Sequence, residues 1–235
     1  MANIDATGQS VREINQAIRQ GIGRKEVVTV QNPGARHNLG VALLESGEVR
    51  IAGSVGYYCG GLSDGASIEI EGSAGWGLAE SMLSGTVRVH GNAGSGAAAA
   101  LRGGTVVIHG DAAARLGVSL KGGTVLVGGN CGYMAGFMGQ KGTLIVCGDA
   151  GEAFADSMYA TECFVGGKVD NLGTDAVLAP MDPSDVVRLE EILTTYLPAE
   201  IRRTKPRGVD FKKVVSGRTL WNFDKRQWKI WQEAL

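Results

Sequence analysis

The chain has 235 residues, enough for one large domain or for one domain with appended arms. Hydrophobic residues make up 44% and charged residues 20%, which excludes wholesale disorder. The net charge is −1, but residues 200–235 hold ten Lys or Arg against four Asp or Glu, which leaves −7 for residues 1–199. The sequence has no run of 18 apolar residues, so a membrane-spanning helix is excluded.

The first ten residues contain neither a basic segment nor an apolar segment of the kind that a secretory signal needs, so we expect no such signal. The cysteines form no CxxC pair and stand at Cys59, Cys131, Cys147 and Cys163. These features together predict a reduced, cytoplasmic protein.

A helix is predicted over residues 10–21. Ser10 and Glu13 have capping-box spacing, apolar residues share one face, and Gly21 is expected to end the helix. A short apolar strand, residues 26–30, and a loop, residues 31–40, are expected to follow. Residues 1–46 therefore form an N-terminal helix and capping segment.

Glycine then recurs on a fixed period. The 37 glycines are about twice the usual share, and they follow no G-X-Y repeat of the collagen kind. Seven of them follow apolar runs such as VRIAG and VVIHG, each 19 residues after the last: Gly53, Gly72, Gly91, Gly110, Gly129, Gly148 and Gly167. A second column follows at Gly56, Gly75, Gly94, Gly132 and Gly151, with Ala113 in the gap. An unbroken period of this length predicts a solenoid whose glycines form the corners.

Each 19-residue turn, which we call a rung, begins with residues that alternate at period 2, as in a β-strand. The positions four and two before the periodic glycine are all apolar or Cys, and we expect them to point inward: Val49/Ile51, Ile68/Ile70, Val87/Val89, Val106/Ile108, Val125/Val127, Leu144/Val146 and Cys163/Val165. A further inward column comprises Met82, Leu101, Leu120 and Met158, with Ser63 and Gly139 as exceptions.

The position after the periodic glycine carries Ser54, Ser73, Asn92, Asp111, Asn130 and Asp149. These residue types favour corners and stack as hydrogen-bonded ladders. The sequence thus predicts an all-β solenoid, a single-stranded parallel β-helix of seven rungs over residues 47–168. A period of 19 disfavours the left-handed hexapeptide type, but the period leaves handedness open.

Residues 169–235 are predicted to form a C-terminal helix and a docking tail. The helix begins at Asp182 with Pro183 at its first position and ends before Pro198. In the tail, Trp221, Trp228 and Trp231 have helical spacing, which favours docking on protein over contact with nucleic acid.

The outward position between the two inward ones divides into two parts. Arg50, Glu69 and Arg88 alternate in sign and are expected to pair across rungs. The next four residues form an apolar stripe that should not face water: Val107, Leu126, Ile145 and Phe164. Either the second helix with the tail covers this stripe, or a partner does.

The chain offers few groups for chemistry. Glu71, His90 and His109 lie on consecutive rungs and are the candidate metal ligands, although parallel side chains one rung apart converge poorly on a tetrahedral ion. Asp111 and Asp149 share a column near acid/base spacing, but they belong to the corner ladder. The GxxG fragments precede no helix and do not match a dinucleotide-binding fingerprint. We therefore expect no catalytic residue, metal or cofactor in this chain.

Rungs such as GTVVIHGDAAARLGVSLKGG and GTLIVCGDAGEAFADSM resemble the glycine-rich β-helix domain at the C-terminus of the glutamate synthase large subunit. They are also similar to a subunit of the formylmethanofuran dehydrogenases and their formyltransferase/hydrolase relatives. The resemblance covers residues 10–170. The chain length, the SVREINQAIRQ helix and the Trp-rich tail are most similar to the stand-alone B subunits of N-methylglutamate synthases, the methylamine–glutamate N-methyltransferases.

The resemblance implies a structural subunit without catalytic residues in a cytoplasmic hetero-oligomer. Its implied partners are a glutaminase-like amidotransferase subunit and a synthase subunit that carries FMN and an iron–sulfur cluster. The complex would make N-methylglutamate and ammonia from methylamine and glutamate. A scaffold role in a formylmethanofuran dehydrogenase or formyltransferase/hydrolase complex is the alternative. A self-contained β-helix enzyme acting on polysaccharide is disfavoured, because no rung carries a long insertion.

Overall fold

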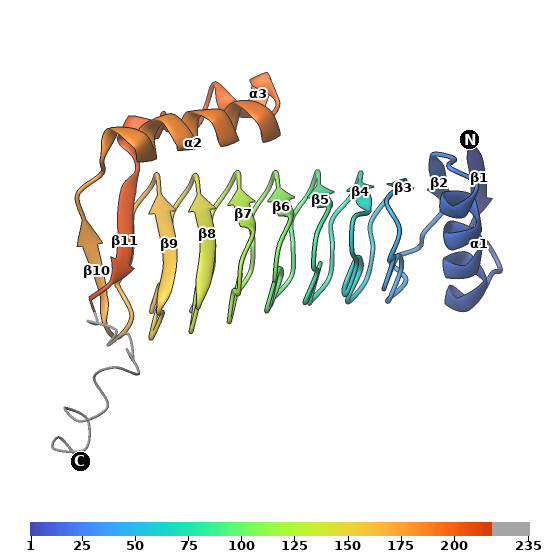
Figure 1. Cartoon of the computed structure of the whole chain (residues 1–235), viewed down its shortest axis with the longest axis horizontal. Coiled ribbons are helices and arrows are strands. Elements are labelled where there is room, and N and C mark those ends of the chain that lie inside the picture. Colours follow the sequence, from blue (N-terminus) through green and yellow to red (C-terminus); the bar gives the residue numbers. More distant parts are fainter. Residues whose placement is uncertain (218–235) are drawn as a thin grey trace, which may run out of the picture.

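The computed structural model describes residues 1–217, and residues 218–235 lie outside the described part. The chain is a parallel β-solenoid with few helices, as the sequence predicts (Figure 1). Seven strands follow one another along the coil: β3 (Glu48–Ala52), β4 (Ser67–Ile70), β5 (Thr86–Val89), β6 (Thr105–Ile108), β7 (Thr124–Val127), β8 (Lys141–Val146) and β9 (Ala160–Val165). Each pairs in parallel with the next, and equivalent residues from Val49 to Val146 are 19 apart in register.

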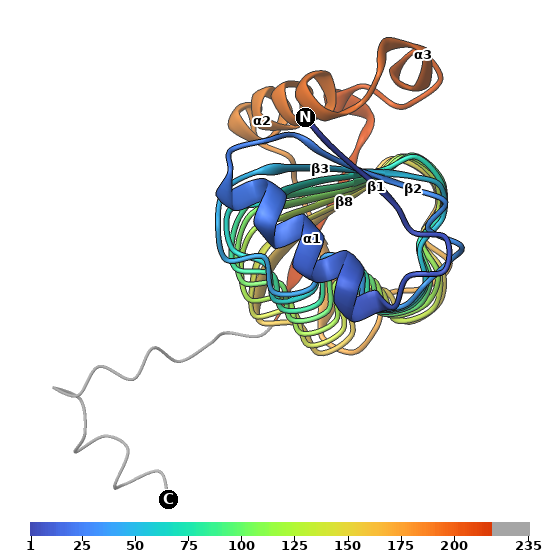
Figure 2. The ribbon, with the colours of Figure 1, turned by 90° about the vertical axis from the view of Figure 1, so that its right-hand side faces the viewer.

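The rest of each rung consists of turns rather than strands. There the rungs join through a ladder of isolated bridges, each one residue long, that runs Val55, Ala74, Ala93, Ala112, Cys131, Ala150 and Val169. Seen along its length, the coil is a ring of superimposed rungs, with the strands on one side and the turns around the rest (Figure 2).

The core fills the inside of this ring. All fourteen side chains of the two predicted inward columns are at most 1% exposed, and so are Met82, Leu101, Leu120 and Met158. The exceptional Ser63 is also buried, and its hydroxyl donates to the carbonyl of Gly40 at 3.2 Å. The alternation at period 2 therefore predicts the inward faces correctly.

The polar corner ladder also forms as predicted. The side-chain oxygen of each ladder residue accepts a hydrogen bond from the backbone N–H of the equivalent residue one rung later, at 2.7–3.1 Å from Ser54 to Asp149. Six of the seven periodic glycines, from Gly72 to Gly167, are required by this ladder, whereas Gly53 has a positive φ of +144°. A Cβ at Gly110, for example, would collide with Oδ1 of Asn92. Gly104, just before β6, is different, because its φ of +77° lies in the left-handed region that favours glycine.

The sheet continues before residue 47. β2 (Val28–Gln31) pairs in parallel with β3, and β1 (Ala2–Asp5) pairs in parallel with β2. The predicted loop, residues 31–40, begins with Gln31, the last residue of β2, and residues 32–40 have no helix or strand. The backbone of this loop nevertheless bonds to the next rung, as from Asn38 N–H to the carbonyl of Tyr57 at 2.7 Å. The coil thus has a further turn that the glycine period does not mark.

α1 (Val11–Gly23) lies across the N-terminal end of the coil (Figures 1 and 2). Its capping box between Ser10 and Glu13 is formed, and Ile14, Ile18 and Ile22 are buried in the core. The expectation that Gly21 ends the helix is wrong, since the helix continues to Gly23. Gly21 instead permits close packing, because a Cβ there would lie 2.5 Å from Cγ2 of Val28.

The C-terminal end of the sheet reverses direction. β11 (Lys212–Ser216) pairs antiparallel with β9, and β10 (Ala176–Ala179) pairs antiparallel with β11. Between them, α2 (Pro183–Tyr196) begins at the predicted cap Asp182, and α3 (Ala199–Arg202) and a 3-10 turn (Gly208–Asp210) follow. α2 lies along the side of the coil, beside the strands (Figure 1).

Candidate functional site

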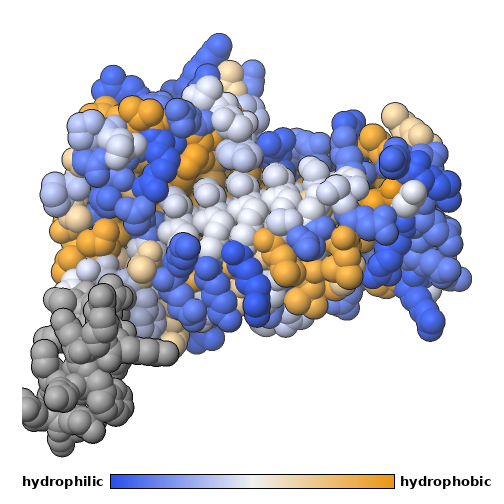
Figure 3. Space-filling view, in the orientation of Figure 1, coloured by the Kyte–Doolittle hydropathy of each residue, from blue (hydrophilic) through white to orange (hydrophobic). Residues whose placement is uncertain are grey.

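The apolar stripe lies beneath α2. Val107, Leu126, Ile145 and Phe164 are each 0% exposed and form one cluster with Cys147, Leu189, Leu193, Leu197 and Phe211. Hydrophobic side chains are visible where the helix meets the coil (Figure 3). The chain's own helix therefore packs on these four residues.

An ion cluster holds the N-terminal end of α2 on the sheet. Asp185 is 3% exposed and accepts hydrogen bonds from Arg188 at 3.0 Å and Lys213 at 2.8 Å. The same two cations also bind Glu162 at 2.9 Å, and both lie over the ring of Phe164. Burial alone would lower the pKa of Lys213, but its bonds to Asp185 and Glu162 outweigh burial and raise it. These groups are saturated by one another, which favours a structural role.

The predicted metal ligands Glu71, His90 and His109 do not come together as a set. His90 Nε2 lies 2.9 Å from Glu69 Oε1, and the rings of His90 and His109 are 5.0 Å apart and tilted by 47°. Within residues 1–217, no group of three His, Cys, Asp or Glu side chains is placed to hold a metal ion. The expected pairing of Arg50, Glu69 and Arg88 is wrong as well, since Arg50 binds Glu48 on its own strand and Glu69 binds His90. A long side chain can pair with any of several charged groups within its reach, so strand register alone does not predict which ion pair forms.

His109 differs from the exposed His90. It is 8% exposed, and its Nε2 has no hydrogen-bond partner. Burial, together with the charges of His90 and Arg88, lowers its pKa. The neutral imidazole is therefore the favoured form of this buried side chain.

The other candidates for chemistry are used by the fold. Asp111 and Asp149 each accept a ladder hydrogen bond. The four cysteines are buried, and burial raises the pKa of Cys59, Cys131 and Cys147 to about 12 and that of Cys163 further. Thiols in this state are poor nucleophiles and poor metal ligands.

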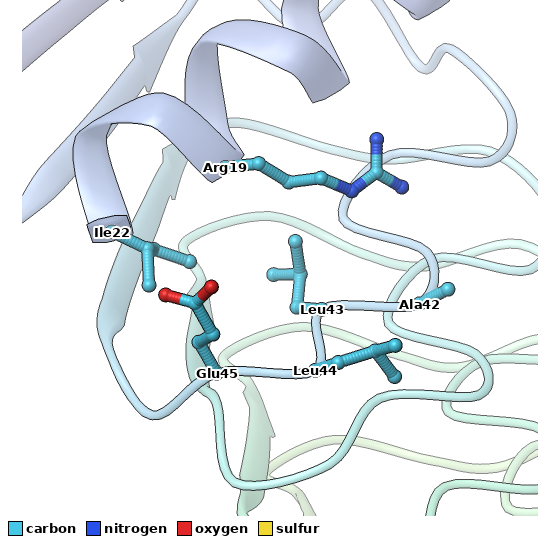
Figure 4. Close-up of a pocket in the computed structure, with 6 residues that line it drawn as sticks. All are labelled: Arg19, Ile22, Ala42, Leu43, Leu44 and Glu45. Carbon is cyan, nitrogen blue, oxygen red and sulfur yellow. The ribbon is translucent and has the colours of Figure 1, made fainter.

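A small pocket of about 210 Å³ lies between α1 and the first turn of the coil (Figure 4). Arg19 and Ile22 project from the helix, opposite the segment 42–45. Arg19 donates to the carbonyl of Val41 at 2.9 Å, so it ties the helix to the coil. The pocket contains no nucleophile beside a base. We therefore interpret it as a gap in the packing between the N-terminal helix and the coil.

The sequence analysis does not single out an exposed aromatic stack on the turn side of the coil. His37, Tyr57 and Trp76 stack with ring centroids 4.3 Å and 5.3 Å apart, both pairs at 16°. Tyr57 is 40% exposed and Trp76 is 58% exposed. The signal is present in the sequence, because Tyr57, Trp76 and Tyr133 all stand four residues after a periodic glycine. The predicted interface residues Trp221, Trp228 and Trp231 lie outside the described residues.

Comparison with known proteins adds one local similarity. No protein-family model matches the chain. Over 72 residues, which are 31% of the chain, the sequence is 41% identical to "Protein GlxC" of Rhizobium meliloti (strain 1021). The match covers 29% of that protein, so the chain corresponds to less than a third of the length of this curated relative. No helix in the described part of the chain is long and apolar enough to cross a membrane.

Proposed function

We propose that this chain is a non-catalytic scaffold subunit of a glutamate synthase-like multi-subunit enzyme. The main observation in favour of this proposal is that the polar groups of the coil are bound to one another or to the backbone. The ladder oxygens bind backbone N–H groups, Asp185 and Glu162 bind the cations that hold α2, and the cysteines are buried with raised pKa values. None of these groups is free to act as a nucleophile or a base, which supports a structural role for them.

The more specific proposal is the scaffold of N-methylglutamate synthase. In this reading a glutaminase-like amidotransferase subunit and an FMN and iron–sulfur synthase subunit carry the chemistry, and the complex converts methylamine and glutamate into N-methylglutamate and ammonia. The rung sequences and the capping helix support it. The local similarity to Protein GlxC adds a relative but says nothing about partners.

Equal rungs suit a scaffold better than an enzyme. A solenoid in which each rung contacts only its neighbours presents a long, rigid surface on which other chains can be positioned. Enzymes of this architecture that act on polysaccharides need a built groove of acidic and basic groups on long loops between rungs. Here the strands from Val49 to Val146 repeat at 19 residues with no insertion between them.

The test is purification of the tagged full chain from its source cells, followed by mass spectrometry of the chains that elute with it. We expect the amidotransferase and the flavin/iron–sulfur subunits in fixed ratio, and a complex that forms labelled N-methylglutamate from ¹⁵N-methylamine and glutamate. The tag alone, expressed in the same cells, is the matched control. A chain that elutes with formylmethanofuran-processing subunits would replace the specific proposal by the alternative scaffold. A chain that elutes alone and cleaves a polysaccharide would overturn the scaffold role itself.

A further inference from the structure

The aromatic stack on the turn side of the coil is interrupted. Backbone hydrogen bonds of 2.8–3.0 Å join Tyr58 N–H to the carbonyl of Trp76, and continue in the same way through Ser95 and Ala114 to Tyr133. Trp76, Ser95, Ala114 and Tyr133 are therefore successive steps of one column, at consecutive rungs. Tyr57 stacks on the preceding side of Trp76, and the next two steps carry only small side chains.

The two empty steps form a groove of about 550 Å³ on the surface. Trp76 and Tyr58 line it on one side and Tyr133 on the other, while Ser95 and Ala114 are among the small residues between them. Trp76, Tyr58 and Tyr133 are 58%, 48% and 49% exposed. Trp76 and Tyr133 are three rungs apart, roughly 14 Å at the usual strand spacing, which leaves room for two further ring planes.

The groove also carries two charges of opposite sign. Both charged residues line the groove: Glu80 lies on the same rung as Trp76, and Arg115 directly follows Ala114. Neither side chain is ion-paired within residues 1–217, whereas Glu162 and Asp185 beside α2 are. Exposed Trp, Tyr and Arg around a hollow are the residue types that dominate the centres of protein interfaces.

We propose that this groove is the docking site for an extended segment of a partner subunit. The segment inserts two planar side chains into the empty steps, presents a cation to Glu80 and presents an anion to Arg115. This inference rests on the proposed scaffold function and names the surface that the function uses.

The charges favour a polypeptide over a sugar as the occupant. A neutral sugar could stack on Trp76 and Tyr133, but it has no charged groups to complement Glu80 and Arg115 together. A polypeptide supplies planar side chains and both signs of charge within a few residues. Aromatic-lined grooves that bind extended segments in this way are a recurring mode of peptide recognition.

The decisive variant is Ala114→Tyr. Tyr57, Trp76 and Tyr133 already show that the column accepts an aromatic residue, so a tyrosine at residue 114 should stack without loss of thermal stability and fill the groove. Trp76→Ala removes one wall instead. Tyr159→Ala is the matched control, because Tyr159 is 37% exposed and does not line the groove.

The experiment reconstitutes the complex from the full chain and the amidotransferase and flavin/iron–sulfur subunits, with affinity measured by titration and thermal stability measured in parallel. We expect Ala114→Tyr and Trp76→Ala to bind the partner at least roughly tenfold more weakly, with Tyr159→Ala unchanged and all three folded. If wild type assembles and both groove variants bind as tightly as Tyr159→Ala, the groove assignment is wrong and the scaffold function stands. If wild type binds neither subunit, the proposed function fails, and the groove assignment fails with it. If the wild-type chain dimerises and Ala114→Tyr is monomeric, the groove binds a second copy of this chain, and the proposal of a partner segment is wrong. If the wild-type chain binds a sugar and both groove variants lose that binding, the groove is a carbohydrate site, and the proposal is again wrong.

Discussion

Replacement of Gly110 by alanine tests why the glycines are periodic. The new Cβ would collide with Oδ1 of Asn92 and lie 2.9 Å from the carbonyl oxygen of Gly91. To make room, the Asn92 side chain must leave the N–H of Asp111, to which it is bound at 2.8 Å. Losing such a bond costs about 0.5–1.5 kcal/mol, and overpacking the backbone contact costs about 1–3 kcal/mol.

The expected loss for Gly110→Ala is therefore about 1.5–4.5 kcal/mol, or roughly 3–18 °C in Tm for a chain of this size. Chemical denaturation followed by far-UV circular dichroism measures it. Gly23→Ala is the control, because a Cβ there meets nothing within 4 Å and the φ of Gly23 is not in the left-handed region; its effect should stay within about 0.5 kcal/mol.

A second mutation separates the collision from other causes. On an Asn92→Ala background the ladder oxygen is absent, so adding Gly110→Ala should cost about 1 kcal/mol less than it does in the wild type. If the two costs add within about 0.3 kcal/mol, the ladder does not explain the glycine, and the corner must be rigid for another reason. A Gly110→Ala protein as stable as wild type would refute the packing argument outright.

Three further outcomes follow from the core and its titratable groups. Ile108→Asp buries an unpaired carboxylate and should cost about 3–5 kcal/mol in chemical denaturation, whereas Val187→Asp on the exposed side of α2 should change little; equal stabilities would contradict the inward assignment. The pKa of His109 is lowered in the folded state, so the neutral imidazole contributes its full stability above pH 6.5, and this contribution is lost as the pH falls below that value. His109→Gln should therefore reduce the loss of unfolding free energy below pH 6.5, measured by chemical denaturation at a series of pH values. An unchanged pH dependence would show that the buried imidazole is not its cause. The four buried cysteines should resist a thiol reagent at pH 8 until the protein is denatured, and rapid labelling of the native chain would show that the coil opens locally.

The inward columns are the part of the fold that sequence reasoning predicts best. Period 2 within a rung and period 19 between rungs assign Val106 and Ile108 to the core because both periods repeat the same physical environment. The start of α2 is predicted equally well, since Asp182 caps the helix and Pro183 occupies its first position. These features depend on local patterns, which the sequence carries directly.

Other features depend on how far side chains reach and on what lies nearby in space. Register places Arg50 beside Glu69, but Glu48 on the same strand is the group that Arg50 binds. Gly21 has the spacing of a helix stop, yet the approach of Val28 decides its role. The first turn of the coil escapes the period because its strand, Val28–Gln31, pairs 21 residues before β3 rather than 19.

The outer columns show where function can reside in such a fold. Inward positions are constrained by the stacking of every rung on its neighbours, so their regularity reflects stability alone. The column of Tyr57, Trp76, Ser95, Ala114 and Tyr133 is under no such constraint, because it tolerates a tryptophan and an alanine at equivalent steps of the same coil. Large aromatic rings are half exposed at some steps and absent at two adjacent ones, so the coil does not require one at every step, and exposing them to water is unfavourable. In a protein whose core is this uniform, an irregular and exposed aromatic column is the place where a specific partner would be recognised.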